Sequence, residues 1–186
     1  MGADCWQEPP VWFSASNTGA VYLLYGNSSL QGIVSLSQAD AKLLGMGSSS
    51  STGSALATAD YDGDGFLDIF LGASHQDDNG SQSGAVFVVQ GPLYGTQSVS
   101  TAYAHFSGIS SFQYAGTSVD GGDLDGDGVA ELLAGATGAL TTDPGQVYLV
   151  AGGSTGGSFS AADAILSGEN GNDQAGASLC FLGDIN

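Results

Sequence analysis

Basic residues are almost missing from this 186-residue sequence. Lys42 stands alone against 19 acidic residues, and the formal net charge is −18. Binding to nucleic acid requires lysine and arginine side chains that neutralise phosphates, so this class of partner is excluded. An anionic membrane surface would repel the chain for the same reason. Scattered acidic residues only keep a protein soluble, whereas acidic residues clustered at a fixed spacing indicate a cation.

Long apolar runs are missing too. No stretch approaches the roughly 18 apolar residues of a membrane helix, so we expect no membrane insertion. Residues 1–10 lack a basic segment followed by an apolar stretch, so no signal peptide is visible. Two cysteines cannot build a disulfide framework. Whether Cys5 and Cys180 pair stays open, and Cys180, in the apolar run 179–182, is expected to be a small core residue.

Catalytic motifs are a third absence. His75 and His105 have no cysteine or histidine partner at metal-binding spacing. The acidic turn at 77–79 is expected to be solvated. No Gly-x-Ser-x-Gly, P-loop or dinucleotide-binding pattern occurs. We therefore expect that the protein is not an enzyme.

Glycine is abundant, with 31 residues. The glycines follow no Gly-X-Y period, which excludes collagen. They recur between short apolar runs, and no window shows the apolar spacing of an amphipathic helix. This pattern predicts an all-β fold with many tight turns.

A repeat of about 60–65 residues organises the sequence. An acidic loop begins at Asp60, Asp123 and Asp184. A Gly-x-Val-[Tyr/Phe] segment and a Ser-x-x-x-Ala segment recur with the same period, at residues 19, 84 and 145 and at residues 37, 100 and 160. One period holds about four short strands, near 103–107, 116–121, 131–135 and 146–151. Four strands per repeat are typical of a β-propeller blade.

Two acidic loops carry the candidate metal sites. Residues 60–68 and residues 123–131 both follow the pattern Asp-x-Asp-Gly-Asp-Gly-x-x-[Asp/Glu]. Calcium prefers six to eight oxygen ligands, and a tight turn with carboxylates at positions 1, 3, 5 and 9 and a backbone carbonyl at position 7 can supply them. The predicted ligands are Asp60, Asp62, Asp64, Phe66 and Asp68 in the first loop and Asp123, Asp125, Asp127, Val129 and Glu131 in the second.

Two alternatives compete with this interpretation. Asp-Gly is a common turn pair, so each loop could be an acidic surface turn. An EF-hand or dockerin loop is also rich in aspartate, but it runs for 12 residues and leads into a helix. Here the closing acid stands at position 9, and the next residues, 69–71 and 132–134, are typical of a strand.

The sequence resembles the FG-GAP repeat family, which forms the blades of integrin α-subunit heads and of many bacterial surface and secreted proteins. The matching segments of the second unit are 114–119, the loop from Asp123, 135–136 and 145–148. Those of the first unit are 53–56, the loop from Asp60, 72–73 and 84–87. The resemblance implies four-stranded antiparallel blades, calcium that rigidifies a hairpin, and an extracellular or cell-surface location. Glu131 departs from the family pattern, where an aspartate is usual.

The repeat sets the expected domain organisation. Residues 1–18 are expected to be a leader, and residues 19–186 to form blades: a part at 19–26, blades near 36–91 and 100–152, and a further part near 160–186. Integrin-type propellers have seven blades, so this chain holds an incomplete ring. We expect further blades from a longer chain or from copies of the same chain.

Three functional hypotheses are consistent with these features. The first is a calcium-stabilised module that binds a protein or glycan ligand, as in adhesion. The second is a structural repeat that assembles with itself at a surface. The third is a non-catalytic segment of a secreted propeller-containing enzyme.

Overall fold

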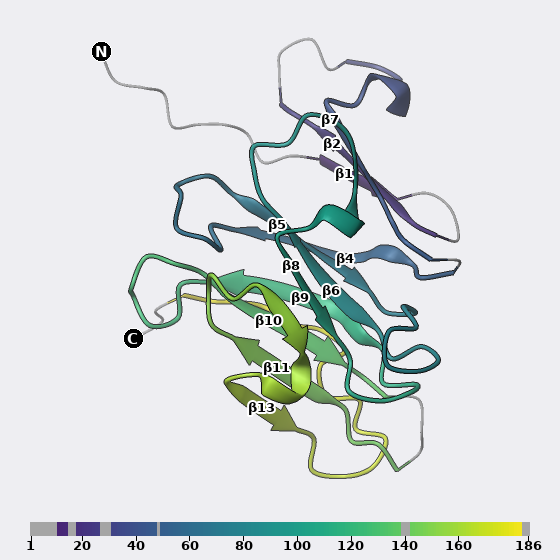
Figure 1. The fold of residues 1–186 in the computed structure, drawn as a ribbon, viewed down its shortest axis with the longest axis vertical. Helices are drawn as coiled ribbons and strands as arrows, with labels where there is room; N and C mark the ends of the chain where they lie inside the picture. Colours follow the sequence, from purple (N-terminus) through teal and green to yellow (C-terminus); the bar gives the residue numbers. More distant parts are fainter. Residues whose placement is uncertain (1–10, 15–17, 27–30, 48, 139–141, 184–186) are drawn as a thin grey trace.

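The computed structural model describes residues 11–14, 18–26, 31–47, 49–138 and 142–183 (Figure 1). In this part of the chain there are thirteen β-strands, three single-turn 3-10 helices and no α-helix, so the expected all-β class is confirmed. The strands are β1 (Val11–Ser14), β2 (Ala20–Leu24), β3 (Ala41–Leu44), β4 (Thr52–Ala59), β5 (Asp68–Ala73), β6 (Ala85–Val89), β7 (Gly95–Ser98), β8 (Ala104–Ser107), β9 (Ala115–Gly122), β10 (Glu131–Ala136), β11 (Gln146–Val150), β12 (Gly156–Ser158) and β13 (Ala164–Ser167). The 3-10 helices are η1 (Leu36–Gln38), η2 (Val99–Thr101) and η3 (Phe159–Ala161).

Two four-stranded antiparallel sheets form the centre of the molecule. The first, blade one, has the order β8-β6-β5-β4, and the second, blade two, has the order β13-β11-β10-β9. Each acidic loop joins the first strand of its blade to the second, β4 to β5 or β9 to β10. The sheets succeed one another along the long axis of the molecule, and within the described residues they do not close into a ring (Figure 1).

A third sheet, the N-terminal sheet, precedes blade one. It contains β1, β2 and β3 in antiparallel order. Strand β1 lies within residues 1–18, which were expected to be a leader, so that expectation is corrected for residues 11–14. Residues 1–10 lie outside the described residues.

Each blade in the structure begins and ends one strand later than the repeat suggested. The expected bounds of 36–91 and 100–152 assign β3 and β8 to the blade that comes after each of them. In the structure β3 pairs with β2 and β8 pairs with β6. Blade one therefore spans 52–107 and blade two spans 115–167. A periodic pattern has no natural starting point, so the period alone could not fix the strand at which a blade begins.

Short parallel strands link each blade to the sheet before it. β7 lies between β6 and β8 in the sequence, but it pairs with β3 of the N-terminal sheet. β12 in the same way leaves blade two and pairs with β8 of blade one. A 3-10 helix follows each of these strands, and a serine side chain caps it, with Ser98 accepting from the Ser100 N–H at 3.2 Å and Ser158 from the Ser160 N–H at 3.3 Å. We call β7 and β12 the outer linking strands.

Close backbone contacts make a second link between sheets. Gly84 has φ +78°, and a Cβ atom there would lie 2.2 Å from the Ala115 carbonyl oxygen, so only glycine fits. Gly19 and Gly145 have the same left-handed backbone. A Cβ atom at Gly19 would lie 2.0 Å from the Thr52 carbonyl oxygen, and one at Gly145 would lie 2.4 Å from the Ala175 carbonyl oxygen. The three equivalent contacts, which we call the inner junctions, are Gly19–Thr52, Gly84–Ala115 and Gly145–Ala175.

Two hydrophobic cores fill the space between neighbouring sheets. One lies between the N-terminal sheet and blade one, with Leu43 and Leu71 among its members. The other lies between blade one and blade two and includes Phe70 and Tyr148. All six residues of β5 are buried, so this strand is covered on both faces. Each fully buried large apolar side chain contributes about 1.5–3 kcal/mol, so blade stacking is the main source of stability.

The structure bears on two further expectations, that Cys180 lies in the core and that no helix crosses a membrane. Cys180 is exposed, so its assignment to the core is corrected. It lies outside the strands of the described part of the chain, and its apolar flanks do not bury it. Cys5 lies outside the described residues. None of the described helices is long and apolar enough to cross a membrane.

Candidate metal sites

The first acidic loop, residues 60–68, is held in shape by its own carboxylates. Asp60 accepts hydrogen bonds from the backbone N–H groups of Gly63 at 2.8 Å and Gly65 at 2.9 Å. Asp62 accepts from the Asp64 N–H at 3.1 Å, and Asp64 accepts from the Phe66 N–H at 2.8 Å. Each of these carboxylates thus fixes the backbone two to five residues further on, and this winds the loop around a common centre.

Asp68 closes the loop from the start of β5. Its side chain is completely buried. One carboxylate oxygen accepts from the Tyr61 N–H at 3.0 Å and the other from the Gly91 N–H at 2.9 Å. Burial raises the pKa of the Asp68 carboxyl, the two N–H donors oppose that shift, and the nearby carboxylates of Asp62 and Asp64 raise the pKa further. A cation beside Asp68 would compensate for both causes of the increase.

Three carboxylates of the first loop converge. One oxygen each from Asp60, Asp62 and Asp68 lies within 4.8 Å of the others. Oxygens that share a calcium ion at about 2.3–2.6 Å lie at most about 5 Å apart, so this cluster fits such an ion. The structure does not bring Asp64 into the cluster. The Asp62 carboxylate also accepts a hydrogen bond from the Gln90 side chain, a partner that the acidic pattern did not predict.

The second loop, residues 123–131, repeats the winding with a different closing residue. Asp123 accepts from the N–H groups of Gly126 at 2.7 Å and Gly128 at 2.9 Å. Here the converging carboxylates are Asp123, Asp125 and Asp127, all exposed, again within 4.8 Å of one another. Glu131 lies outside this cluster.

Glu131 has the same structural role as Asp68. Its carboxylate accepts from the Leu124 N–H at 2.6 Å, as Asp68 accepts from the Tyr61 N–H. Only the shorter Asp68 combines this bond with a place in a carboxylate cluster. The backbone carbonyls of Phe66 and Val129 stay predicted ligands.

The element after each loop decides between the competing loop types. β5 begins at Asp68 and β10 at Glu131, so each loop leads directly into a buried strand. An EF-hand or dockerin loop leads into a helix, and neither loop here does. Each acidic loop is the connection of a β-hairpin.

A family model named FG-GAP repeat matches residues 52–89 and 115–150. The two matches begin at the first residues of β4 and β9 and end at the last residues of β6 and β11. Both segments are FG-GAP repeats. A search of curated proteins found no match to the chain.

The acidic loop of the first FG-GAP repeat also contacts the second repeat. Tyr61 is completely buried, and its hydroxyl donates to the carbonyl oxygens of Ala151 at 3.2 Å and Ser154 at 3.1 Å. The Gly153 N–H donates to the Tyr61 carbonyl at 2.7 Å. The ring packs edge-on against Phe70, with centroids 5.5 Å apart. No sequence pattern predicted this contact, because the corresponding residue of the second repeat is Leu124.

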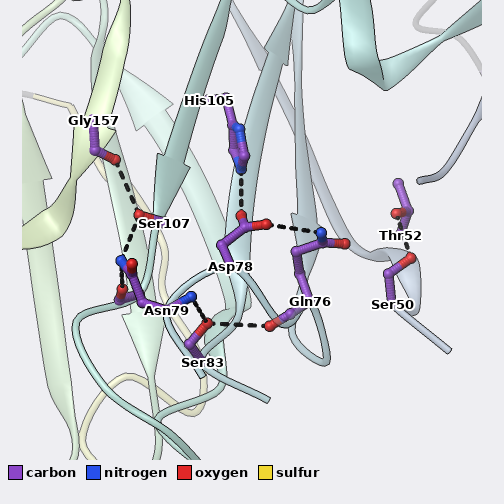
Figure 2. A network of polar contacts seen from close by, with 10 residues as sticks. Ser50, Thr52, Gln76, Asp78, Asn79, Ser83, His105, Ser107 and Gly157 are labelled. Carbon is purple, nitrogen blue, oxygen red and sulfur yellow. Dashed lines mark hydrogen bonds and ion pairs between the residues drawn. The ribbon is translucent and has the colours of Figure 1, made fainter. Parts of the chain in front are cut away.

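A polar network lies at the opposite end of the first repeat, in the connection between β5 and β6 (Figure 2). Asp78 lies 2.6 Å from the His105 ring and accepts from the Gln76 side chain at 2.9 Å. Asn79 donates to Ser107 at 2.9 Å. The turn at 77–79 is therefore not merely solvated, because it ties its loop to β8. His105 is also not isolated, since its ring stacks on Phe87 with centroids 4.4 Å apart.

Proposed function

We propose that the chain is a calcium-stabilised, non-enzymatic binding module of an extracellular or cell-surface protein. The observation that carries the proposal is the buried carboxylate of Asp68, which faces Asp60 and Asp62 across one small space in a loop of an FG-GAP repeat. A protein or glycan ligand is the partner that we infer for the module.

The electrostatics of the loops supports a bound cation. Two unit charges 4 Å apart repel by about 4 kcal/mol at an effective dielectric constant of about 20. Three converged carboxylates contain three such pairs, and a divalent cation replaces this repulsion with attraction. The donor set consists of oxygens only, which suits calcium better than zinc or copper.

The stabilisation can be estimated from linkage. Calcium that binds the folded hairpin and not the unfolded chain adds about 2.7 kcal/mol per site when its free concentration is 100 times the dissociation constant. Because Tyr61 carries the first loop onto blade two, the ion at that loop would stabilise the stacking of the repeats as well as one hairpin.

A binding role is supported over catalysis by the shortage of basic side chains. The chain has one lysine and two histidines. Of these, His105 is paired with Asp78, and Lys42 lies over the Tyr22 ring at 5.0 Å. A structural repeat that assembles at a surface, or a non-catalytic segment of a secreted enzyme, remains the alternative role.

The test is thermal unfolding followed by calorimetry, with calcium and with a chelator. We expect the chelator to lower the melting temperature of the wild type. Asp62→Ala combined with Asp125→Ala should abolish the difference between the two conditions. Glu169→Gln, which removes an exposed acid outside both loops, should preserve it. A wild-type melting curve that is the same in calcium and in chelator would refute the proposal.

A further inference from the structure

The two acidic loops contact one another through their backbones. The Ala130 N–H, in the second loop, donates to the carbonyl oxygen of Asp60, in the first loop, at 2.8 Å. Ala130 is 5% exposed, so water has little access to this bond. A hydrogen bond between main-chain atoms therefore joins the candidate metal site of blade one to that of blade two.

The donor belongs to a peptide group that also serves the second loop. A trans peptide group is planar, and its C=O and N–H point in opposite directions. The group between Val129 and Ala130 is trans, so while its N–H points at Asp60 its carbonyl points the opposite way. This Val129 carbonyl is the backbone ligand that the acidic pattern predicts at position 7 of the second loop.

The acceptor belongs to a second peptide group, which continues the path into the first loop. The group between Asp60 and Tyr61 presents its carbonyl to Ala130, and its N–H donates to the Asp68 carboxylate at 3.0 Å. Asp68 is completely buried and is a member of the carboxylate cluster of the first loop. Two peptide groups in series thus lead from position 7 of the second loop to the closing acid of the first. We call this path the peptide relay.

Packing between the loops supports the peptide relay. A Cβ atom at Gly63 would lie 3.1 Å from one methyl carbon of Val129, and a Cβ atom at Gly152 would lie 2.4 Å from the other. The Val129 side chain therefore lies between the turn of the first loop and the segment that follows β11. The Gly153 N–H donates to the Tyr61 carbonyl at 2.7 Å, so blade two also holds the next carbonyl of the first loop.

We propose that the two acidic loops bind calcium with positive cooperativity, and that the peptide relay couples them. This inference rests on the proposed function, because it requires that both loops bind the ion. When either loop is filled, its ligand at one end of the relay, Val129 or Asp68, becomes fixed, and the two peptide groups between them become ordered. The backbone of the other loop is then partly in place, so a smaller loss of conformational entropy opposes binding there.

The strength of hydrogen bonds in series adds to this effect. Hydrogen bonds in a chain polarise one another. A Val129 carbonyl that shares its electrons as a ligand makes the Ala130 N–H a stronger donor, and the strengthened bond to Asp60 does the same for the next N–H along the relay. Repulsion between two bound cations opposes the coupling, but salt at about 0.15 M screens charges over about 8 Å, whereas buried interactions are screened much less.

Cooperativity gives the two repeats a common response to calcium. Independent sites would fill over separate ranges of concentration, each set by its own ligands. Coupled sites fill together over a narrower range, so both hairpins and the contact between them become rigid in one step. The stacking of blade one on blade two is thereby part of the calcium response, because the peptide relay crosses the boundary between the blades.

Isothermal titration calorimetry of the full chain, in about 0.15 M salt, measures the coupling. Asp62→Ala disables the first loop and Asp125→Ala the second, and neither residue belongs to the peptide relay. Each of these variants gives the binding constant of one loop alone. The product of the two wild-type constants, divided by the product of the two single-loop constants, is the coupling factor. We expect a coupling factor of at least about five, the lower end of typical couplings.

The loss of a charged ligand also changes the electrostatic field at the other loop, so the coupling factor needs a control for charge. Val129→Ala keeps every charge and every predicted ligand, and it removes the methyl groups that pack between the loops. In this background the same titrations should give a clearly lower coupling factor. Leu124→Ala is the matched control, because it shortens an apolar side chain of the same loop that is 58% exposed, and it should leave the factor unchanged.

Hydrogen exchange adds a measurement that does not depend on Val129→Ala. In Asp125→Ala only the first loop can bind calcium, while the Ala130 amide lies in the second loop. Calcium should slow the exchange of the Ala130 amide. It should have less effect on the Gly128 amide, which donates to Asp123 within the second loop at 2.9 Å. Unchanged exchange at Ala130 would show that the relay transmits no ordering and would overturn the inference.

The outcomes separate the coupling from the proposed function. A wild type that binds calcium at both loops with a coupling factor of one or less would overturn the cooperativity and leave the calcium-stabilised module standing. A coupling factor that is the same in the wild type and in Val129→Ala would trace the coupling to charge alone and would overturn the role of the contact. A wild type that binds no calcium would overturn both proposals.

Discussion

The hydroxyl of Tyr61 lies 3.1 Å from the carbonyl oxygen of Ser154, so a residue of the first acidic loop is anchored in the following blade. The Tyr61 N–H meanwhile donates to Asp68, the buried acid of the candidate metal cluster. One residue thus connects the metal site of blade one to the packing of blade two. This connection makes the stability of the interface depend on the geometry of the loop.

Replacement of Tyr61 by phenylalanine tests the connection. Tyr61→Phe keeps the ring and removes the donor to Ala151 and Ser154. This should lower the free energy of unfolding by about 0.5–1.5 kcal/mol, the net contribution of a hydrogen bond. Tyr103→Phe is the matched control, since its hydroxyl donates to Gly153 at an exposed site. Urea unfolding measures both. Equal losses of unfolding free energy in Tyr61→Phe and Tyr103→Phe would show that the hydrogen bonds of the buried Tyr61 hydroxyl contribute no more than the exposed bond of Tyr103.

The pH dependence of stability should change sign with calcium. Without the ion, burial and the neighbouring carboxylates raise the pKa of Asp68. A carboxyl with a raised pKa in the folded state contributes stability that is complete below its unfolded pKa, ordinarily about 3.9, and is lost as the pH rises through the folded value. With calcium bound, the charged form is favoured, and the contribution of Asp68 should increase with pH.

Melting temperatures across this acidic range, with calcium and with a chelator, check the sign. The contribution of Asp68 is the difference between the wild type and Asp68→Asn, which removes the titrating group and preserves the shape of the side chain. If this difference in melting temperature changes with pH in the same way in calcium and in chelator, calcium does not act at Asp68.

Glu131 and Asp68 allow the two loops to be compared directly. Both carboxylates accept the N–H of the second loop residue, but only that of Asp68 also lies in a carboxylate cluster. Glu131→Asp shortens the side chain by one methylene and should bring the acid into the position that Asp68 occupies. We expect the calcium affinity of the second loop to increase by about three- to tenfold, since an additional charged ligand strengthens such sites.

Isothermal titration calorimetry in an Asp62→Ala background measures the second loop alone. The reciprocal variant Asp68→Glu, in an Asp125→Ala background, should weaken the first loop. An affinity that falls with Glu131→Asp would show that Glu131 reaches the ion when the ion is bound.

Much of the architecture was predictable because the repeat marks it. The strands at β5 and β10 could be inferred from apolar runs bounded by Asp-Gly turns, and the period of the landmarks predicted stacked blades. The ends of the blades were not predictable, since nothing in a periodic pattern distinguishes the last strand of one blade from the first strand of the next. β1 was missed because Val11–Ser14 comes directly after a pair of prolines and no acidic loop precedes it.

The sequence predicted the spacing of the acidic residues in the two metal loops, but it did not predict which of their carboxylates converge. The pattern assigned equal roles to all four carboxylates of each loop, whereas the structure clusters Asp68 in one loop and Asp127 in the other. Both closing side chains accept the N–H of the second loop residue, and they differ in length by one methylene. The contact from Tyr61 to blade two had no sequence signal at all, because it is made across 93 residues and only one of the two repeats has tyrosine at this position.

The inner junctions provide a last prediction, which separates backbone strain from steric collision. Gly84 and Gly153 both have a left-handed backbone, with φ +78° and φ +72°. A Cβ atom at Gly84 would lie 2.2 Å from the Ala115 carbonyl oxygen, while a Cβ atom at Gly153 meets nothing within 4 Å. Gly153→Ala should therefore lose about 1–2 kcal/mol of unfolding free energy, the cost of the left-handed conformation alone.

Gly84→Ala should lose clearly more than Gly153→Ala, because blade two must also move away from blade one to make room for the methyl group. Urea unfolding of both variants measures the difference, and a broader or two-step transition in Gly84→Ala would show the blades separating before they unfold. Equal losses at the two positions would mean that the sheets slide at little cost. The inner junction would then be a loose contact, and glycine would stand at residue 84 only for its backbone conformation.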